Sequence, residues 1–246
     1  MRKTIIFFIA SFIYAGIATA QTDYEMLEIM YLKPKPDMMK ELTKAMGEHN
    51  KKYHADGPYG VSVWSCELGP HFNQLAWVMG PCTFTALDSR PDTKEHEDDW
   101  SNNVEPLIEG TGIEYWKYNK DLSYVPENYK LTPKVVWTVF DIKPFEGYRF
   151  KEMCKKIAEV YKAKSYPYNF QVYFNQFDSK EGRDVAIEVG FEKWAFFDRD
   201  ENFKKDYEEI HGEGTFQQLL DEYRDVVVSV EDEVAEIIPE MSGTVN

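Results

Sequence analysis

The sequence is poor in cysteine, the residue that forms disulfide cross-links. It has 3 cysteines in 246 residues, namely Cys66, Cys82 and Cys154. An odd number leaves at least one thiol unpaired. Cys66 and Cys82 flank a predicted hairpin in which Cys66 lies opposite about Leu75, whereas a disulfide needs Cα atoms within about 7 Å of each other. We therefore expect no disulfide scaffold, and we expect Cys154, on an apolar helix stripe, to act as a small core residue.

Familiar catalytic motifs are absent as well. The chain has no G-x-S-x-G elbow, no phosphate-binding P-loop, no dinucleotide-binding glycine pattern and no C-x-x-C pair. These absences remove the motif-based arguments for a serine hydrolase of that type, a P-loop NTPase, a Rossmann dehydrogenase and a thioredoxin-like oxidoreductase.

Basic residues are fewer than acidic ones. The chain carries 28 Lys and Arg against 43 Asp and Glu, a formal net charge of −15 at pH 7. Nucleic acids and anionic membrane surfaces are bound through clustered positive charge. We therefore expect no nucleic-acid partner, and the acidity itself mainly favours solubility.

The one long apolar run lies at the N-terminus. The basic pair Arg2-Lys3 precedes an apolar stretch over residues 5–17, and Ala18-Thr19-Ala20 follows before the polar Gln21. This is the layout of a secretory signal peptide, and the run is short against the about 20 residues that span a bilayer. We expect residues 1–20 to be cleaved, and the mature protein to be periplasmic or secreted without membrane insertion.

One seven-residue pattern occurs twice in similar form. PYGVSVW at 58–64 returns as PYNFQVY at 167–173, an offset of 109. Other matches keep nearly the same offset: Lys33-Pro34 with Lys143-Pro144, Met39-Lys40-Glu41-Leu42 with Phe150-Lys151-Glu152-Met153, Gly80 with Gly190, and Asp88 with Asp198. The spacing is too long for a solenoid repeat and suits a small domain. We predict a duplication, with a first repeat over 21–128 and a second over 129–246.

Each repeat shows the same order of elements. Strands are expected where β-branched and aromatic residues run between turn residues, and helices where apolar residues recur at three and four. The predicted strands are 26–32, 59–67, 73–80 and 112–118, then 135–142, 170–177, 184–191 and 231–238. Two long helices are predicted. The first begins after Asp37, which serves as its cap, and the second spans 148–164. Shorter helices are expected within 92–103, around 203–210 and from Thr215, which with Gln218 forms a capping box.

The order βαββαβ is the ferredoxin-like plan, with helices on one face of a four-stranded sheet. Two copies can cover each other's bare sheet faces, and aromatic residues of the strands, such as Trp64, Trp77, Trp137 and Tyr173, offer the area to do so. The chain therefore resembles the dimeric α/β-barrel superfamily, with two repeats fused in tandem. The fold expected is α+β, two ferredoxin-like repeats packed sheet to sheet, as a monomer with an internal pseudo-dimer or as a homodimer.

That resemblance implies several functions. Members include cofactor-independent monooxygenases, haem-binding and haem-degrading enzymes, small-lactone isomerases and proteins without known activity, and they place ligands between the sheet and its helices. The first repeat is the better candidate, because it holds His49, His54 and His71. The site residues we select are His54 as a base with Tyr59 as its polar partner, and His49, Trp64, Trp77 and Trp116 as ligand-binding residues.

These residues also have structural interpretations. His49 can pack on its helix stripe, and His54 can stabilise a helix C-terminus. On one helix His49 and His54 would point about 140° apart, which is poor for joint metal ligation. His96 opens an acidic run, 96–99, that suits a helix N-terminus. His54 or His211 could serve as an axial haem ligand, but no sequence spacing around either residue indicates a haem site. We therefore expect no metal and no cofactor.

Three functions remain. The first is an exported protein that binds a small apolar or aromatic ligand in a pocket between sheet and helices. The second is a cofactor-independent monooxygenase or isomerase that uses His54. The third is a non-catalytic scaffold. A pocket containing His54 would favour the enzyme, an aromatic pocket the binder, and a filled interior the scaffold.

Overall fold

The computed structural model describes residues 24–199 and 202–243, and the predicted signal peptide lies outside them. The first repeat contains β1 (Met26–Pro34), α1 (Met39–Tyr53), β2 (Val61–Leu68), β3 (Leu75–Cys82), α2 (Phe84–Asp88), α3 (Lys94–Asp99) and β4 (Ile108–Tyr118). The second contains β5 (Lys134–Ile142), α4 (Gly147–Lys164), β6 (Gln171–Asn175), β7 (Val185–Phe191), α5 (Phe203–His211), α6 (Thr215–Val226) and β8 (Val227–Ile237). The predicted strands and long helices are confirmed, with ends shifted by a few residues.

Two predicted helix caps are wrong. Asp37 has a left-handed backbone, with φ of 63°, and α1 starts after Met38 without a side-chain cap. Likewise α6 follows Gly214, and the hydroxyl of Thr215 donates to the carbonyl of Gly212 instead of capping the helix. Tertiary packing of the apolar stripes therefore holds these helices without the local signals that we expected.

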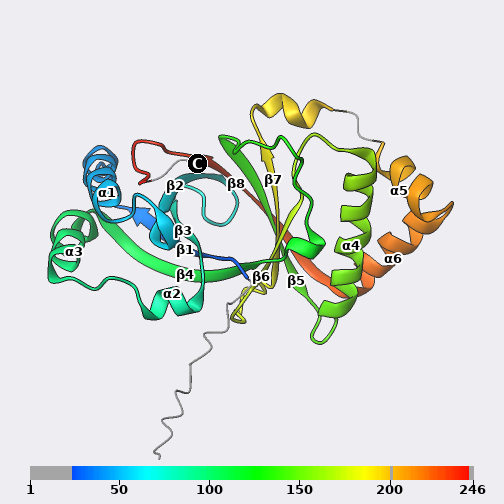
Figure 1. Ribbon diagram of the computed structural model, residues 1–246, viewed down its shortest axis with the longest axis horizontal. Helices are drawn as coiled ribbons and strands as arrows, with labels where there is room; N and C mark the ends of the chain where they lie inside the picture. Colours follow the sequence, from blue (N-terminus) through cyan, green and yellow to red (C-terminus); the bar gives the residue numbers. More distant parts are fainter. Residues whose placement is uncertain (1–23, 200–201, 244–246) are drawn as a thin grey trace, which may run out of the picture.

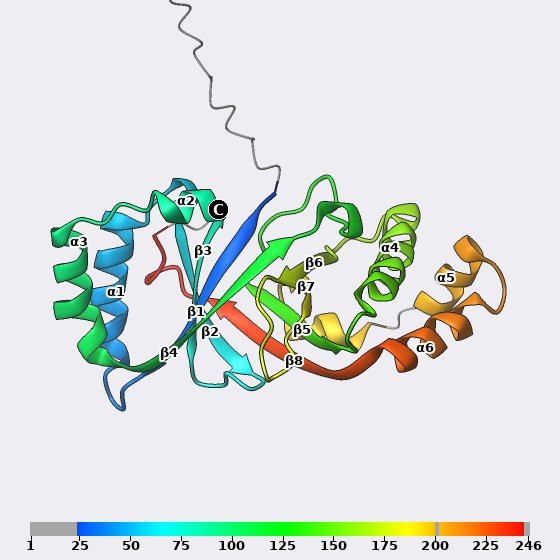
Figure 2. The same ribbon diagram turned by 90° about the horizontal axis from the view of Figure 1, so that it is seen from below.

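The eight strands close into one barrel. Their order around it is β1-β3-β2-β8-β5-β7-β6-β4, and all neighbours are antiparallel. Each repeat therefore contributes four adjacent strands in the same internal order, and the β2–β8 and β4–β6 ladders join the two repeats. Figure 1 and Figure 2 show the helices of the two repeats at opposite ends of the molecule, with the strands between them. This is the tandem α/β barrel that the duplication predicted.

The strands are apolar on both faces, which creates three cores. In the first repeat the outward face packs beneath α1, and in the second beneath α4 and α6. The third core is the barrel interior, where the inward faces of the two half-sheets meet around Trp64, Trp116, Trp137 and Tyr173. Trp77 instead belongs to the helix-side core of the first repeat. It was expected to press on the other sheet, and that expectation was wrong, because Ala76 takes the inward position on β3.

The end of the chain returns to the first repeat. The N–H groups of Ile238 and Gly243 donate to the carbonyls of Val63 and Val61. Met241 is fully buried, and its carbonyl accepts a bond from the side chain of Asn50 on α1. The second repeat thus supplies part of the packing around the helix that carries His49.

All three cysteines are buried and unpaired, as expected for Cys66 and Cys82. Within residues 24–199 and 202–243, none of the helices combines the length and the apolar character that crossing a bilayer requires.

Candidate metal centre

Two of the histidines come from α1 and the residue after it. His49 lies on the apolar stripe of the helix, below Leu42 and Met46, and is 1% exposed. His54 is the first residue beyond Tyr53, with φ of −133° and ψ of 34°, and is 4% exposed. Because His54 has left the helix, the helical angle of about 140° does not apply to it. The expectation that these two rings point apart was therefore wrong.

The third histidine comes from α3, on a segment that packs across α1. Thr93 caps this short helix by accepting a bond from the backbone N–H of His96. Lys52 forms an ion pair with Glu95 at 2.7 Å, which adds a surface contact between α1 and α3. His96 is half-buried and points inward, whereas its acidic neighbours face solvent.

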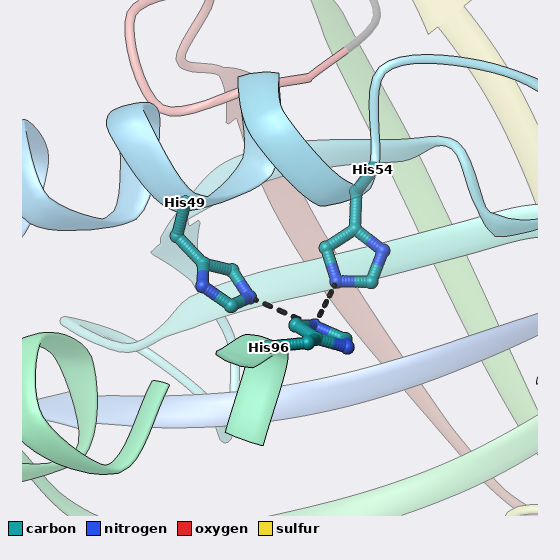
Figure 3. A group of neighbouring side chains, drawn as sticks. All are labelled: His49, His54 and His96. Carbon is teal, nitrogen blue, oxygen red and sulfur yellow. Dashed lines mark hydrogen bonds between the residues drawn. The ribbon is translucent and has the colours of Figure 1, made fainter. Parts of the chain in front are cut away.

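The three imidazoles converge on one point (Figure 3). The Nε2 atom of His96 lies 3.2 Å from Nε2 of His49 and 3.2 Å from Nε2 of His54. One ligand atom from each ring lies within 4.8 Å of the other two. The cluster joins residues 42 and 47 positions apart, so no local sequence pattern reveals it.

The hydrogen bonds of two rings fix where their protons reside. Nδ1 of His49 lies 2.7 Å from a carboxylate oxygen of Asp99, and Nδ1 of His54 lies 2.9 Å from the backbone carbonyl of Tyr59. Both partners only accept, so each Nδ1 carries a hydrogen. In the neutral rings both Nε2 atoms then present lone pairs toward His96, whose Nε2 can carry at most one hydrogen. At least one close nitrogen pair therefore has two lone pairs opposed, which a shared cation would relieve.

The surroundings of His49 and His54 favour their neutral forms. The pKa of His54 is lowered to about 4, chiefly by burial and to a smaller extent by the neighbouring histidines, while the hydrogen bond to the carbonyl of Tyr59 acts against this shift. Burial also lowers the pKa of His49, although Asp99 acts against this effect. A neutral imidazole is the form that ligates a metal. Asp99 is itself held by Asn103 through its other oxygen, which orients the carboxylate toward His49 rather than toward the centre.

Aromatic rings enclose the cluster. Tyr53 stacks on His96 at 4.6 Å between centroids, Trp77 meets His54 edge-on at 5.1 Å, and Trp100 meets His49 at 5.2 Å. The indole N–H of Trp77 donates to the buried side chain of Asn50. This apolar, hydrogen-bonded shell fixes the rings and limits access of solvent, as outer shells do in protein metal sites.

Two of the three separations between the ligand nitrogens suit a tetrahedral ion. Zinc–imidazole distances of about 2.0–2.1 Å and tetrahedral angles place two ligand nitrogens about 3.4 Å apart, close to the two separations of 3.2 Å found here. Imidazole ligands suit zinc, copper, iron and nickel, whereas carboxylate and carbonyl oxygens suit magnesium and calcium. Three protein ligands leave a fourth tetrahedral position for water or a substrate.

The remaining predicted site residues are dispersed. The hydroxyl of Tyr59 donates to the carbonyl of Ala86, so this residue gives His54 its backbone oxygen and not its phenol. Trp77 belongs to the shell of the histidine cluster. Trp64 and Trp116 lie on the other side of the sheet, inside the barrel. His49 was selected as a ligand-binding residue, and it lies in the histidine cluster rather than in the wall of an aromatic pocket.

The two candidate haem ligands do not fit that role. Nε2 of His54 faces His96 at 3.2 Å, which leaves no room for a porphyrin plane between the rings. Nε2 of His211 lies 3.0 Å from the carbonyl of Lys156, so this nitrogen carries the hydrogen that the carbonyl accepts and has no lone pair for iron.

Comparison with known proteins identifies the fold and no function. No protein-family model and no curated protein sequence matches the chain. Solved structures do match. A protein of Fusobacterium nucleatum provisionally named a monooxygenase has a TM-score of 0.56 at 13% identity, covering 87% of this chain and 92% of its own. An anthrone oxidase-like protein gives 0.54 at 12% identity, covering 89% and 92%.

A chlorite dismutase from Candidatus Nitrospira defluvii gives 0.54 at 10% identity, covering 88% of this chain and 92% of its own. At these identities the likeness concerns the fold alone. The chain has the dimeric α/β-barrel fold, with both ferredoxin-like halves in one polypeptide.

Proposed function

We propose that this chain is an exported metal-binding protein, whose His49, His54 and His96 hold a divalent transition metal through their Nε2 atoms, with zinc the best fit. The convergence of three imidazole nitrogens carries the proposal. A buried group of three nitrogens that share at most one hydrogen is costly unless something binds it, since unpaired buried polar atoms lose their solvation.

The coordination is of the catalytic type. Structural zinc sites use four protein ligands, whereas catalytic sites use three and keep one position open. Among the described residues, the cluster offers three imidazoles, and the carboxylate of Asp99 binds Nδ1 of His49, on the side of that ring away from the cluster. A zinc ion in such a site lowers the pKa of a bound water to about 7 and so supplies a hydroxide near neutral pH. Metal-assisted hydrolysis is the reaction class that follows.

The cofactor-independent alternative has less support. It requires His54 to take a proton from a substrate with help from Tyr59. The Nε2 atom of His54 faces His96, its Nδ1 is engaged by a carbonyl, and the phenol of Tyr59 is used elsewhere.

Metal stoichiometry tests the proposal. The chain purified without its signal peptide or any histidine tag is loaded with Zn²⁺, dialysed and analysed by plasma emission spectrometry, and titrated with Zn²⁺ calorimetrically. We expect one zinc per chain. His96→Ala should abolish tight binding, since two imidazoles remain. His211→Ala, which removes a histidine on α5 outside the cluster, should bind like the parent protein.

Hydrolysis of 4-nitrophenyl acetate by zinc-loaded protein then tests the catalytic role, with His96→Ala as the blank. Equal zinc content in the parent and His96→Ala proteins would disprove the metal centre. Zinc binding without any hydrolysis above the blank would restrict the centre to a structural role, in which the metal pins α3 to α1.

Export is the second half of the proposal and rests on residues 1–20, which lie outside the described structure. N-terminal sequencing of protein expressed with its full leader in a bacterial host should find Gln21 first in the periplasmic fraction or the medium. Material that retains Met1 in the cytoplasm would contradict it.

A further inference from the structure

The barrel interior contains a cavity that the metal centre does not use. Its volume is about 200 Å³, and it lies between the inward faces of the two half-sheets. Most of the lining is apolar or aromatic: Leu27, Ile29, Tyr31, Trp64, Ala76, Val78, Val135, Trp137 and Ala235. Leu131 also lines it and is 43% exposed, so the cavity reaches the surface beside the segment that links the repeats. An apolar cavity of about 150 Å³ is large enough to bind benzene.

One polar group in the lining has no partner. Trp137 is 8% exposed, and its indole Nε1 is buried without a hydrogen-bond acceptor among the described residues. A buried donor without an acceptor is rare in folded proteins and calls for a bound group. On the flanking strands Glu188 and Glu233 are the residues paired with Trp137, yet neither accepts from it.

The two carboxylates are occupied by other donors. Glu188 accepts from the side chains of Asn169, Gln171 and Tyr173, at 3.0, 3.1 and 3.3 Å.

Glu233 accepts from Arg183 at 2.6 Å and from His71 at 3.0 Å, and Arg183 also binds Glu114. The other indole on the cavity, that of Trp64, donates to the hydroxyl of Ser62. The indole N–H of Trp137 is therefore, among the described residues, the N–H donor on the cavity wall that lacks an acceptor, and two nearby carboxylates disfavour an anionic ligand.

We propose that the barrel cavity binds a small, uncharged aromatic molecule that carries one hydrogen-bond acceptor, with that acceptor on the indole N–H of Trp137. The aromatic body packs against Trp64, Tyr31 and the aliphatic lining, and it enters beside Leu131. The site lies on the opposite face of the sheet from the histidine cluster, so it is independent of the metal.

Three matched probes test this proposal by calorimetric titration: acetophenone, ethylbenzene and benzoate. Acetophenone and ethylbenzene have similar shapes, but only acetophenone has a carbonyl acceptor. One hydrogen bond to a buried donor predicts that acetophenone binds roughly tenfold tighter than ethylbenzene. Benzoate, as an anion, should bind more weakly than both.

Variants locate the site. Trp137→Phe should reduce acetophenone affinity to the level of ethylbenzene and leave ethylbenzene affinity unchanged, while Trp194→Phe, at an exposed tryptophan, should alter neither. Ala235→Leu fills the cavity and should abolish binding of both, with cooperative thermal unfolding as the check that it folds. His96→Ala should bind both probes like the parent protein, which separates this proposal from the metal centre.

Equal affinities for acetophenone and ethylbenzene in the parent protein would overturn the role of Trp137, leaving its N–H to a water molecule. Undiminished binding to a folded Ala235→Leu protein, or no binding of either probe to the parent, would overturn the cavity as a ligand site.

Discussion

The carboxylate that orients His49 in the proposed metal centre gives a quantitative prediction. Asp99 accepts from Nδ1 of His49 at 2.7 Å and does not face the proposed metal position. Asp99→Ala should leave all three ligands in place but loosen one of them. Loss of an outer-shell carboxylate of this kind typically weakens metal binding about 10- to 100-fold.

The effect appears as a change in metal-induced stabilisation. At a free Zn²⁺ concentration 100 times the parent Kd, binding stabilises the parent protein by about 2.7 kcal/mol. For a variant that binds 10- to 100-fold more weakly, the same concentration gives about 1.4 to 0.4 kcal/mol. A chain of this size gains about 2–4 °C in Tm for each kcal/mol, so zinc should raise Tm by about 5–11 °C in the parent and about 1–6 °C in the variant.

Differential scanning calorimetry with and without Zn²⁺ measures both shifts. The matched control is Asp98→Ala, which removes the same charge from the same helix, where Asp98 pairs with Lys94 at the surface. Asp98→Ala should keep the parent's full zinc-induced shift. Identical shifts in the two variants would refute the orienting role of Asp99, and a parent protein without any shift would refute the centre itself.

Three further predictions concern the framework. Gly47→Ala would place a Cβ 2.3 Å from a backbone carbonyl of the C-terminal segment, so it should lower the free energy of unfolding by about 1–3 kcal/mol in denaturant titrations. The control Gly147→Ala places its Cβ where nothing lies within 4 Å, so it should leave the free energy of unfolding unchanged or raise it. Arg183→Met would remove the cation shared by the buried Glu233 and the half-buried Glu114 and leave Glu233 with His71 alone, at a cost of about 3–5 kcal/mol. Arg224→Met, at an exposed ion pair, should cost less than about 0.5 kcal/mol. Burial raises the pKa of Glu188, so its ionisation costs stability as pH rises through that pKa. Glu188→Gln should therefore exceed the parent's Tm at pH 8, by a margin that shrinks toward pH 4, and a margin independent of pH would contradict this.

The duplication made the architecture predictable. Two stretches 109 residues apart repeat the same pattern, and each repeat has one bare sheet face, so burial of apolar area requires the faces to meet. What the sequence did not show was which face each aromatic takes. Because both faces of these strands are buried, apolar residues do not alternate with polar ones, and the parity of Trp64 and Trp77 cannot be read from the pattern.

The histidine cluster escaped prediction for a different reason. His54 leaves the helical path one residue after α1 ends, and helix ends are located from sequence only to within a few residues. His96 sits in an acidic, solvent-facing helix whose position across α1 is set by tertiary contacts. Four of the five histidines fall in the first repeat, which was a usable signal. Of these, His71 lies apart from the cluster, where it stacks on Tyr31 and pairs with Glu233, and His96 was assigned to an acidic helix N-terminus.

The central claim is that three imidazoles of one chain share a metal ion. X-ray absorption spectroscopy at the zinc edge of the loaded protein tests it most directly. Our account predicts three imidazole nitrogens and one oxygen at about 2.0–2.1 Å in a four-coordinate shell. A shell of oxygen ligands alone, or a spectrum that His96→Ala leaves unchanged, would contradict it.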